Sequence, residues 1–203
     1  MIKLYHVPTS RSTRSLWLLN ELGIDFELVE MPFDLKYLRA PEYLAVHPLG
    51  RVPCLVDDGQ VIFESGAICQ YLCERYDDGK LGRDPGHPER YEWLQWIHYA
   101  ETVAVHGASL VQQAVFIAEK DRSPVVQKLE GRRLEKAVEV LDNHLKDRDY
   151  MLASGFSAAD TSVAFSIYLG RQFISLDTFS NVGEYMARLR ERPAFQKSFP
   201  EGD

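Results

Sequence analysis

Hydroxyl side chains and two arginines crowd into residues 6–17, HVPTSRSTRSLW, between a short apolar stretch and a helix-like run. A hydroxyl at a helix start can cap the helix by accepting a hydrogen bond from a free backbone N–H. The same hydroxyl can donate to an anion that binds at that helix end. The segment therefore predicts a capped helix start, a hydroxyl that faces a reactive atom, or both. The side chains in question are Ser10, Ser12, Thr13 and Ser15, with Arg11 and Arg14.

A second candidate segment is HPLGRVPCL, residues 47–55. Pro53 stands at the start of a predicted strand, where a residue without an N–H is tolerated. The alternative is a cis Val52–Pro53 bond, which turns the Val52 backbone outward so that its N–H and C=O can pair with an extended peptide ligand. Because only about 5% of X–Pro bonds are cis, spacing alone favours the plain strand start. The order of elements described below favours cis.

A third candidate segment is FESGAI, residues 63–68, where a predicted strand passes into a predicted helix. Glu64 or Ser65 can cap that helix, and an acid suits its positive end. The free N–H groups and the Ser65 hydroxyl also form a cradle for a carboxylate. The two interpretations are compatible, because a bound carboxylate itself caps the helix.

The elements that must position these segments alternate between strand and helix. A strand, helix, strand start implies a right-handed crossover and parallel pairing. The turn at 57–59 then joins two short strands into a hairpin, and a helix follows. This order is typical of a thioredoxin-like sheet. The predicted strands are 2–7, 26–30, 53–56 and 60–63, and the predicted helices are 12–22 and 65–76, with room for one short helix near 40–46.

The second half of the chain is predicted to be helical. Residues 77–88 are rich in Gly, Pro and charge, which favours a linker. Beyond them apolar residues recur at helical spacing. We therefore predict a thioredoxin-like α/β domain at 1–78, a linker at 79–87 and an all-α domain at 88–203. The predicted helices are one of about thirty residues across 93–118 and shorter ones at 134–145, 159–170 and 182–189.

Composition excludes several function classes. The chain has 203 residues and a formal net charge of -7, with a sequence pI near 5.4, so it has no global attraction to nucleic acid or to anionic membranes. Neither a signal peptide nor a membrane span is visible. Three cysteines without ligand spacing predict no disulfide framework and no metal site. We expect a reducing, cytoplasmic location. The cysteines are Cys54, Cys69 and Cys73.

The three candidate segments, in this order and followed by a helical half, resemble the cytosolic glutathione S-transferase family. The resemblance covers essentially the whole chain and rests on G-R-V-P followed by E-S-G-A-I, after an S-x-S-x-x-R opening. HYAE, residues 98–101, resembles a bacterial and fungal branch with a serine-type active site. GFSAADTSVAF, residues 155–165, resembles the family's buried capping box, in which Ser157 caps a helix and Asp160 reaches back.

The resemblance implies a glutathione site on the first domain. Val52, ahead of Pro53, would pair with the cysteinyl backbone of glutathione, and Glu64 with Ser65 would hold its γ-glutamyl end. Arg51 is expected to reach a carboxylate. Glu101 would receive the γ-glutamyl amine across a homodimer interface, or is an ordinary helix-surface acid. His47 departs from the Asn that the family commonly has before this Pro.

The resemblance also implies that a serine lowers the pKa of the glutathione thiol. Ser10 matches the family's catalytic serine, and Ser12 is the alternative at a shifted position. Tyr5 is a third possible donor. A thiol with a pKa near 8.5 is mostly protonated at pH 7, and a shift of two units needs about 2.7 kcal/mol. A hydrogen bond to an anion supplies about 1.5–3 kcal/mol, and the helix N-terminus about 0.3–1 kcal/mol more.

The function that follows is a homodimeric, cytoplasmic glutathione transferase that conjugates glutathione to electrophilic apolar small molecules, as in detoxification. Glutathione is the co-substrate, and no metal, nucleic acid or membrane partner is expected. The alternatives are a glutathione-dependent reductase, peroxidase or isomerase, and a non-catalytic binding protein of the same fold. The second-substrate pocket has only weak candidates, since aromatic residues at helical spacing are typical of a core. These are Tyr99, His106, Phe116 and Tyr168.

Overall fold

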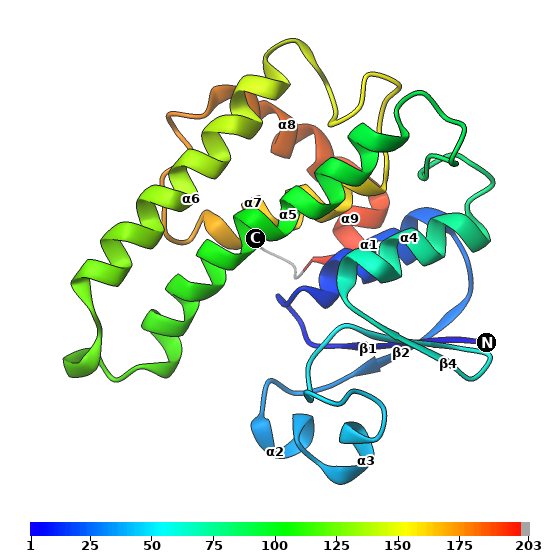
Figure 1. The fold of residues 1–203 in the computed structure, drawn as a ribbon, viewed down its shortest axis with the longest axis horizontal. Coiled ribbons are helices and arrows are strands. Elements are labelled where there is room, and N and C mark those ends of the chain that lie inside the picture. Colours follow the sequence, from blue (N-terminus) through cyan, green and yellow to red (C-terminus); the bar gives the residue numbers. More distant parts are fainter. Residues whose placement is uncertain (200–203) are drawn as a thin grey trace. The chain divides into compact units, whose positions relative to one another are not determined.

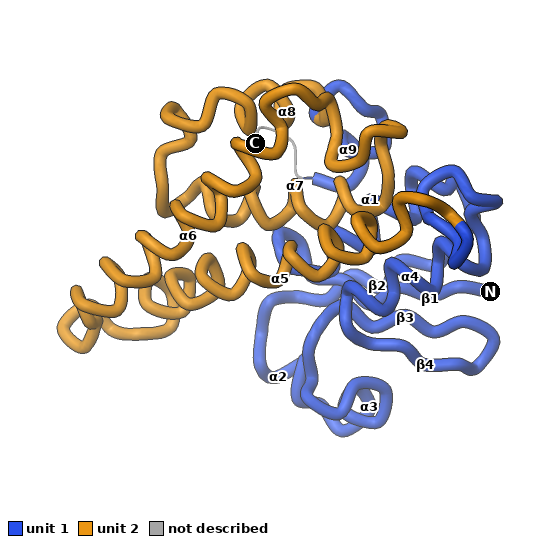
Figure 2. Tube along the Cα trace, turned by 45° about the horizontal axis from the view of Figure 1, so that its top comes forward, with its two compact units in different colours: residues 1–86, 190–203 blue, residues 87–189 orange. Residues whose placement is uncertain are grey.

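A computed structural model describes residues 1–199 and divides into two compact units (Figure 2). The first unit is Met1–Gly86 together with the chain from Arg190, and the second is His87–Leu189. The sequence prediction placed the chain from residue 190 in the helical domain, whereas the structure groups it with the first unit. The functional division at 78 and 88 stays a prediction.

A four-stranded sheet with the order β2-β1-β3-β4 forms the centre of the first unit. β1 (Ile2–His6) pairs in parallel with β2 (Phe26–Glu30) and antiparallel with β3 (Cys54–Asp57), which continues into β4 (Gln60–Phe63). The parallel pair follows from the crossover, and the antiparallel pair from the Asp57–Gln60 hairpin.

Two helices cover one face of this sheet, and two short helices lie on its other side (Figure 1). α1 (Ser12–Leu22) and α4 (Ser65–Tyr76) pack against each other over core residues that are fully buried, such as Leu4, Leu18 and Leu55. α2 (Leu35–Leu38) and α3 (Pro41–Leu44) replace the single short helix predicted near 40–46.

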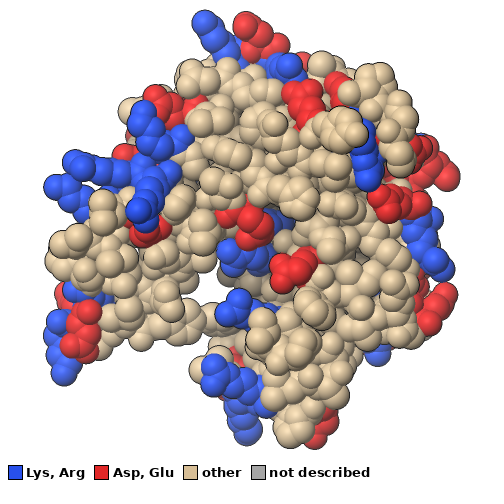
Figure 3. Space-filling view, viewed as in Figure 1, with Lys and Arg blue, Asp and Glu red and all other residues tan. Residues whose placement is uncertain are grey.

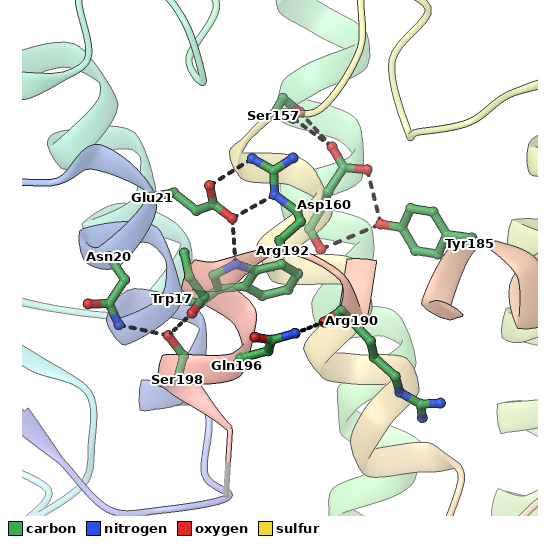
Figure 4. A network of polar contacts seen from close by, with 11 residues as sticks. Trp17, Asn20, Glu21, Ser157, Asp160, Tyr185, Arg190, Arg192, Gln196 and Ser198 are labelled. Atoms are coloured by element: carbon green, nitrogen blue, oxygen red, sulfur yellow. Dashed lines mark hydrogen bonds and ion pairs between the residues drawn. The ribbon is translucent and has the colours of Figure 1, made fainter. Parts of the chain in front are cut away.

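A C-terminal helix that the sequence did not predict, α9 (Pro193–Ser198), packs against α1. The Trp17 ring meets the rings of Phe195 and Phe199 edge-on, at centroid distances of 5.0 and 5.7 Å. Arg192 donates two hydrogen bonds of 2.7 Å to the Glu21 carboxylate, which also accepts from the Trp17 indole at 2.8 Å (Figure 4). These contacts explain why this segment belongs to the first unit.

The second unit is built on α5 (Arg90–Val111), α6 (Pro124–His144), α7 (Ala158–Gly170) and α8 (Ser180–Arg190). The long predicted helix ends at Val111 and continues as a short π-helix, Gln112–Phe116. α7 is buried on all sides and packs against α5, as its unbroken apolar character predicts. The predicted fold class, a thioredoxin-like α/β unit followed by helices, is confirmed.

The predicted capping box at the start of α7 is present and fully buried. The Asp160 carboxylate accepts hydrogen bonds from the backbone N–H groups of Ser157, at 2.7 Å, and Met151, at 2.9 Å. It also accepts from the Tyr185 hydroxyl at 3.0 Å (Figure 4). One carboxylate therefore satisfies donors from the helix start, the preceding loop and α8.

Replacement of Asp160 by Ala tests this network. Three buried donors then lose their acceptor at about 1–3 kcal/mol each, so we expect the free energy of unfolding to fall by at least about 3 kcal/mol. For a chain of this length that corresponds to a Tm lower by about 6–12 °C. Calorimetry measures it, with the exposed Asp121→Ala as the matched control. Equal melting of the two variants would contradict the structural role of Asp160.

Candidate functional site

The chain turns sharply after β1 and brings Ser10 back over the end of the strand. Thr9 has φ 57°, a left-handed conformation that is rare for a β-branched residue. Such backbone strain collects at functional sites. The turn lets the Ser10 hydroxyl donate to the Val7 carbonyl at 2.8 Å, while the Ser10 N–H donates to the same oxygen at 3.3 Å.

Ser10 and Ser12 lie in different environments, although their hydroxyl oxygens are only 2.7 Å apart. Ser10 is half-buried, whereas Ser12 is 0% exposed. The Ser12 hydroxyl oxygen accepts from the Val7 N–H at 3.1 Å and lies 3.2 Å from the Val7 carbonyl. Ser10 is thus the outer hydroxyl of the pair, and Ser12 is enclosed.

The inner end of this cluster is His6, which the sequence analysis did not single out. Its Nδ1 lies 2.7 Å from the Ser12 hydroxyl oxygen, and the side chain is 3% exposed. Burial lowers the pKa of His6 to about 4, so the imidazole is neutral at physiological pH. No spacing pattern marks a single His at the end of a strand; the contact exists only because the loop returns to β1.

The Val52–Pro53 peptide bond is cis. Val52 packs against the buried cluster of Val7, Leu38 and Tyr43, next to the origin of the Ser10 loop. Within residues 1–199 the Val52 backbone forms no backbone–backbone hydrogen bond outside a helix or strand. Its N–H and C=O are therefore available to a ligand with an extended backbone.

His47 performs locally the role of the Asn that the resemblance leads one to expect there. Its Nδ1 accepts a hydrogen bond from the Leu49 N–H at 3.1 Å, two residues on, as an Asn side chain does in a turn. Tyr43 donates to the Arg51 carbonyl at 2.6 Å and so supports the same loop. The Arg51 side chain itself is exposed.

Glu64 and Ser65 begin α4, but neither makes the predicted capping bond. Glu64 occupies the N-cap position with φ 76° and no side-chain cap. The Ser65 hydroxyl accepts from the Arg14 guanidinium at 2.9 Å instead. Arg14 is 2% exposed and directs its charge toward the start of α4.

These contacts join the three candidate segments within the first unit. Ser10 donates to the Val7 carbonyl, Val52 packs on the cluster that contains Val7, and Arg14 links α1 to Ser65. The arrangement offers a hydroxyl, an extended backbone edge and a positively charged helix start, which suits a peptide that carries a thiol and a carboxylate.

The remaining predicted side chains have surroundings of their own. Glu101 is half-buried on α5 of the second unit, and its role stays a prediction. Thr13 and Ser15 are buried in α1, and their hydroxyls have no hydrogen-bond partner among the described residues. Tyr5 stacks at a tilt against Tyr43, with ring centroids 5.2 Å apart.

The second unit has a groove of about 440 Å³ between α5 and α6. Tyr99 and His106, two weak candidates for a second-substrate pocket, line it, and His106 lies 2.7 Å from the Glu130 carboxylate. Lys and Arg side chains gather over α6 with acidic groups beside them (Figure 3). Ion pairs such as Arg133–Glu130 and Lys136–Glu139 account for part of this charge.

Residues 1–199 contain neither a metal-ligand cluster nor a membrane-spanning helix. No group of three or more His, Cys, Asp or Glu side chains in this part of the chain could hold a metal ion. None of the helices described is both long enough and apolar enough to cross a bilayer.

Comparison with known proteins places the chain in one class, the glutathione transferases. The family described as "Glutathione S-transferase, N-terminal domain" matches residues 1–74. Glutathione S-transferase 3 of Schizosaccharomyces pombe is 31% identical, over 96% of this chain and 85% of that protein. Probable glutathione S-transferase GSTF2 of rice is 32% identical, over 97% and 94%.

A solved structure agrees with these relatives. The glutathione transferase from Pseudomonas putida, with one glutathione disulfide bound per subunit, superposes with a TM-score of 0.87 at 26% identity, over 100% of this chain and 92% of that one. The chain belongs to the glutathione S-transferase family. It is an enzyme, a transferase, as the sequence predicted.

The buried His6 predicts how stability depends on pH. Its folded pKa, about 4, lies below the ordinary 6.5, so the unfolded chain takes up a proton first and stability falls as the pH drops from 6.5 toward 4. Between pH 7 and pH 5 the wild type should lose about 2 kcal/mol more than His6→Asn, which cannot be protonated in this range. Urea unfolding of both proteins measures the difference.

The comparison of the wild type with His6→Asn removes an opposing contribution to the pH dependence of stability. Burial raises the pKa of Asp160 to about 6, which favours the folded state as the pH falls through the same window. This effect is common to both proteins and cancels in their difference. A difference in stability that does not change with pH would show that His6 is not buried in its neutral form.

Proposed function

We propose that the enzyme binds glutathione on its first unit, activates it as a thiolate and conjugates it to electrophilic apolar small molecules. The observation that carries this proposal is a set of contacts within the first unit: Ser10 donates to the Val7 carbonyl, Val52 packs on the cluster that contains Val7, and Arg14 of α1 donates to Ser65. The bound glutathione disulfide of the Pseudomonas putida relative supports the choice of ligand.

The proposed binding mode divides glutathione between two segments. Val52, held ahead of Pro53, pairs with the cysteinyl backbone, and Glu64 with Ser65 receives the γ-glutamyl carboxylate and amine. The Arg14 charge, 2.9 Å from the Ser65 hydroxyl, favours the carboxylate there. Arg51, exposed on the loop before Val52, is free to turn toward another carboxylate. Glu101 receives the γ-glutamyl amine of the partner copy in a homodimer.

The proposed role of Ser10 is to donate a hydrogen bond to sulfur. The thiol releases its proton to solvent, the thiolate attacks the electrophilic carbon, and the new C–S bond forms as a leaving group departs or a π-bond opens. A hydrogen bond to the anion and the adjacent helix start supply about 2–4 kcal/mol, enough for a two-unit fall in pKa. No general base is needed.

Burial favours Ser10 over Ser12 as the donor. Ser12 is 0% exposed, and its hydroxyl is surrounded by His6, Val7 and Ser10. Ser10 is half-buried, and its hydroxyl donates to the Val7 carbonyl, from which a better acceptor can draw the hydrogen. A thiolate is such an acceptor, because hydrogen bonds to ions are stronger than those between neutral groups.

The finer assignments belong to the same proposal. They are a serine-type active site of the bacterial branch, a homodimer, a cytoplasmic location and a role in detoxification. The three cysteines are buried, so a glutathione-dependent reductase or peroxidase would have to work through glutathione sulfur alone. Analysis of the products separates that chemistry from conjugation, and a protein that binds glutathione without turnover would be a carrier.

Replacement of Ser10 by Ala tests the assignment of the sulfur donor. We expect the pKa of bound glutathione, read from thiolate absorbance in an ultraviolet titration, to rise by about 1–2 units. The rate of conjugation at pH 6.5 should fall by about 10–100-fold, since that rate follows the thiolate fraction. An unchanged thiol pKa would remove Ser10 from its proposed role, and absence of glutathione binding by the wild type would remove the proposed function.

Replacement of Ser65 by Ala separates binding from activation. The loss of a hydroxyl bond to a carboxylate should raise the Kd of glutathione about tenfold or more, because hydrogen bonds to charged groups contribute about 1.5–3 kcal/mol. The bound thiol should keep its pKa. Titration calorimetry measures the Kd, with the exposed Ser175→Ala as the control. A wild-type Kd in the Ser65 variant would place the γ-glutamyl end elsewhere.

A further inference from the structure

A continuous line of short hydrogen bonds runs from a buried imidazole to the half-buried Ser10 hydroxyl. His6 Nδ1 lies 2.7 Å from the Ser12 hydroxyl oxygen, and that oxygen lies 2.7 Å from the Ser10 hydroxyl oxygen. His6 is 3% exposed and Ser12 is 0% exposed. The line therefore starts inside the protein and ends at the side chain proposed to face glutathione sulfur.

The direction of this line depends on where the single Ser12 hydroxyl hydrogen points. Ser12 already accepts a hydrogen bond from the Val7 N–H at 3.1 Å. Its own hydrogen can go to His6 Nδ1, to the Ser10 hydroxyl or to the Val7 carbonyl. A neutral imidazole carries a hydrogen on only one of its two nitrogens, so the His6 tautomer decides between these acceptors.

The two tautomers have opposite consequences for Ser10. If the hydrogen is on Nε2, Nδ1 is an acceptor and draws the Ser12 hydrogen inward, which leaves Ser10 to donate to Ser12 or Val7. If the hydrogen is on Nδ1, His6 donates to Ser12, and Ser12 is left to donate to Ser10. Ser10 then receives a hydrogen bond at its oxygen and keeps its own hydrogen for another acceptor.

We propose that His6 and Ser12 are positioning residues that act through Ser10: His6, in the Nδ1–H form, donates to Ser12, Ser12 donates to Ser10, and Ser10 directs its hydrogen to the glutathione sulfur. This inference rests on the proposed function of Ser10 and extends it inward by two residues. Neither His6 nor Ser12 touches the ligand in this arrangement.

The cluster is compatible with this direction. Burial lowers the pKa of His6, which keeps the ring neutral, so that Nδ1 can donate in one tautomer and accept in the other. The Val7 carbonyl retains the Ser10 N–H bond at 3.3 Å when the Ser10 hydroxyl turns away from it. A donor behind Ser10 polarises its O–H bond, since hydrogen bonds in a chain strengthen one another.

The test measures the pKa of the bound glutathione thiol in variants of Ser12 and His6. Ser12→Ala and His6→Leu should each raise that pKa by about 0.5 units, because chains of hydrogen bonds gain roughly 10–30% per bond. The Kd of glutathione should stay at the wild-type value. His6→Asn places an amide N–H where Nδ1–H stood, so in this variant the pKa of bound glutathione should stay close to the wild-type value. His144→Leu, which removes another partly buried imidazole, is the matched control.

The outcomes separate the two proposals. The line of hydrogen bonds from His6 through Ser12 to Ser10 is called the relay. If Ser10→Ala raises the thiol pKa but Ser12→Ala and His6→Leu do not, the relay is wrong and the role of Ser10 stands. If Ser10→Ala has no effect either, the proposed function of Ser10 is wrong and the relay fails with it. Equal shifts in His6→Asn and His6→Leu would also overturn the relay, because packing alone would then explain them.

A measurement on the wild type decides the matter if the variants do not fold. Nitrogen-15 NMR distinguishes a protonated Nδ1 from a protonated Nε2 by the chemical shifts of the two ring nitrogens. We expect the Nδ1–H tautomer for His6 in the glutathione-saturated enzyme. The Nε2–H tautomer would reverse the line of hydrogen bonds and overturn the inference.

Discussion

Two hydrogen bonds from Ser10 converge on the carbonyl oxygen of Val7, the first residue after β1. The donors are the Ser10 N–H and the Ser10 hydroxyl, the Ser12 hydroxyl oxygen lies 3.2 Å from the same carbonyl, and the Val7 N–H donates to Ser12. The Val7 side chain lies in the buried cluster on which Val52 packs. Val7 therefore holds the candidate sulfur donor through its peptide group and takes part, through its side chain, in the cluster beneath the candidate peptide edge. The strand before Val7, β1, is held on both sides, by its parallel neighbour β2 and by its antiparallel neighbour β3.

The second constraint is electrostatic and comes from a buried cation. Arg14 is 2% exposed, and the dehydration of a guanidinium is costly unless good hydrogen bonds compensate for it. A carboxylate bound at the Ser65 hydroxyl would provide such compensation in addition to the N–H groups at the start of α4. In the proposed binding mode, this carboxylate would take the place of the side-chain cap that α4 lacks.

The parts of the fold that sequence could predict are those set by local pattern. The alternation at 2–30, the hairpin at Asp57–Gln60 and the capping box of Ser157 and Asp160 depend on residues close in sequence. The helix α9 was missed because it is six residues long and is held by distant partners, the Trp17 ring and the Glu21 carboxylate. The hydrogen bond from Arg14 to Ser65 joins side chains that are 51 residues apart, so no local sequence pattern indicates it. His6 was missed for the same reason, since only the strained turn at Thr9 brings Ser12 back beside it.

The three protein thiols are buried, and two of them are also held in the protonated form. Burial raises the pKa of the Cys54 thiol to about 11, and the hydrogen bond with Cys69 together with burial raises that of Cys73. Such thiols stay protonated at neutral pH and are poor nucleophiles. In the proposed mechanism, the half-buried Ser10 would stabilise an anion without taking part in a proton transfer. Because His6 behind it is neutral above about pH 5, the pH dependence of the reaction should be that of the glutathione thiol itself. On this proposal the protein would set that pKa by geometry, through the direction of a single hydroxyl hydrogen, and not by a charged side chain that could itself titrate.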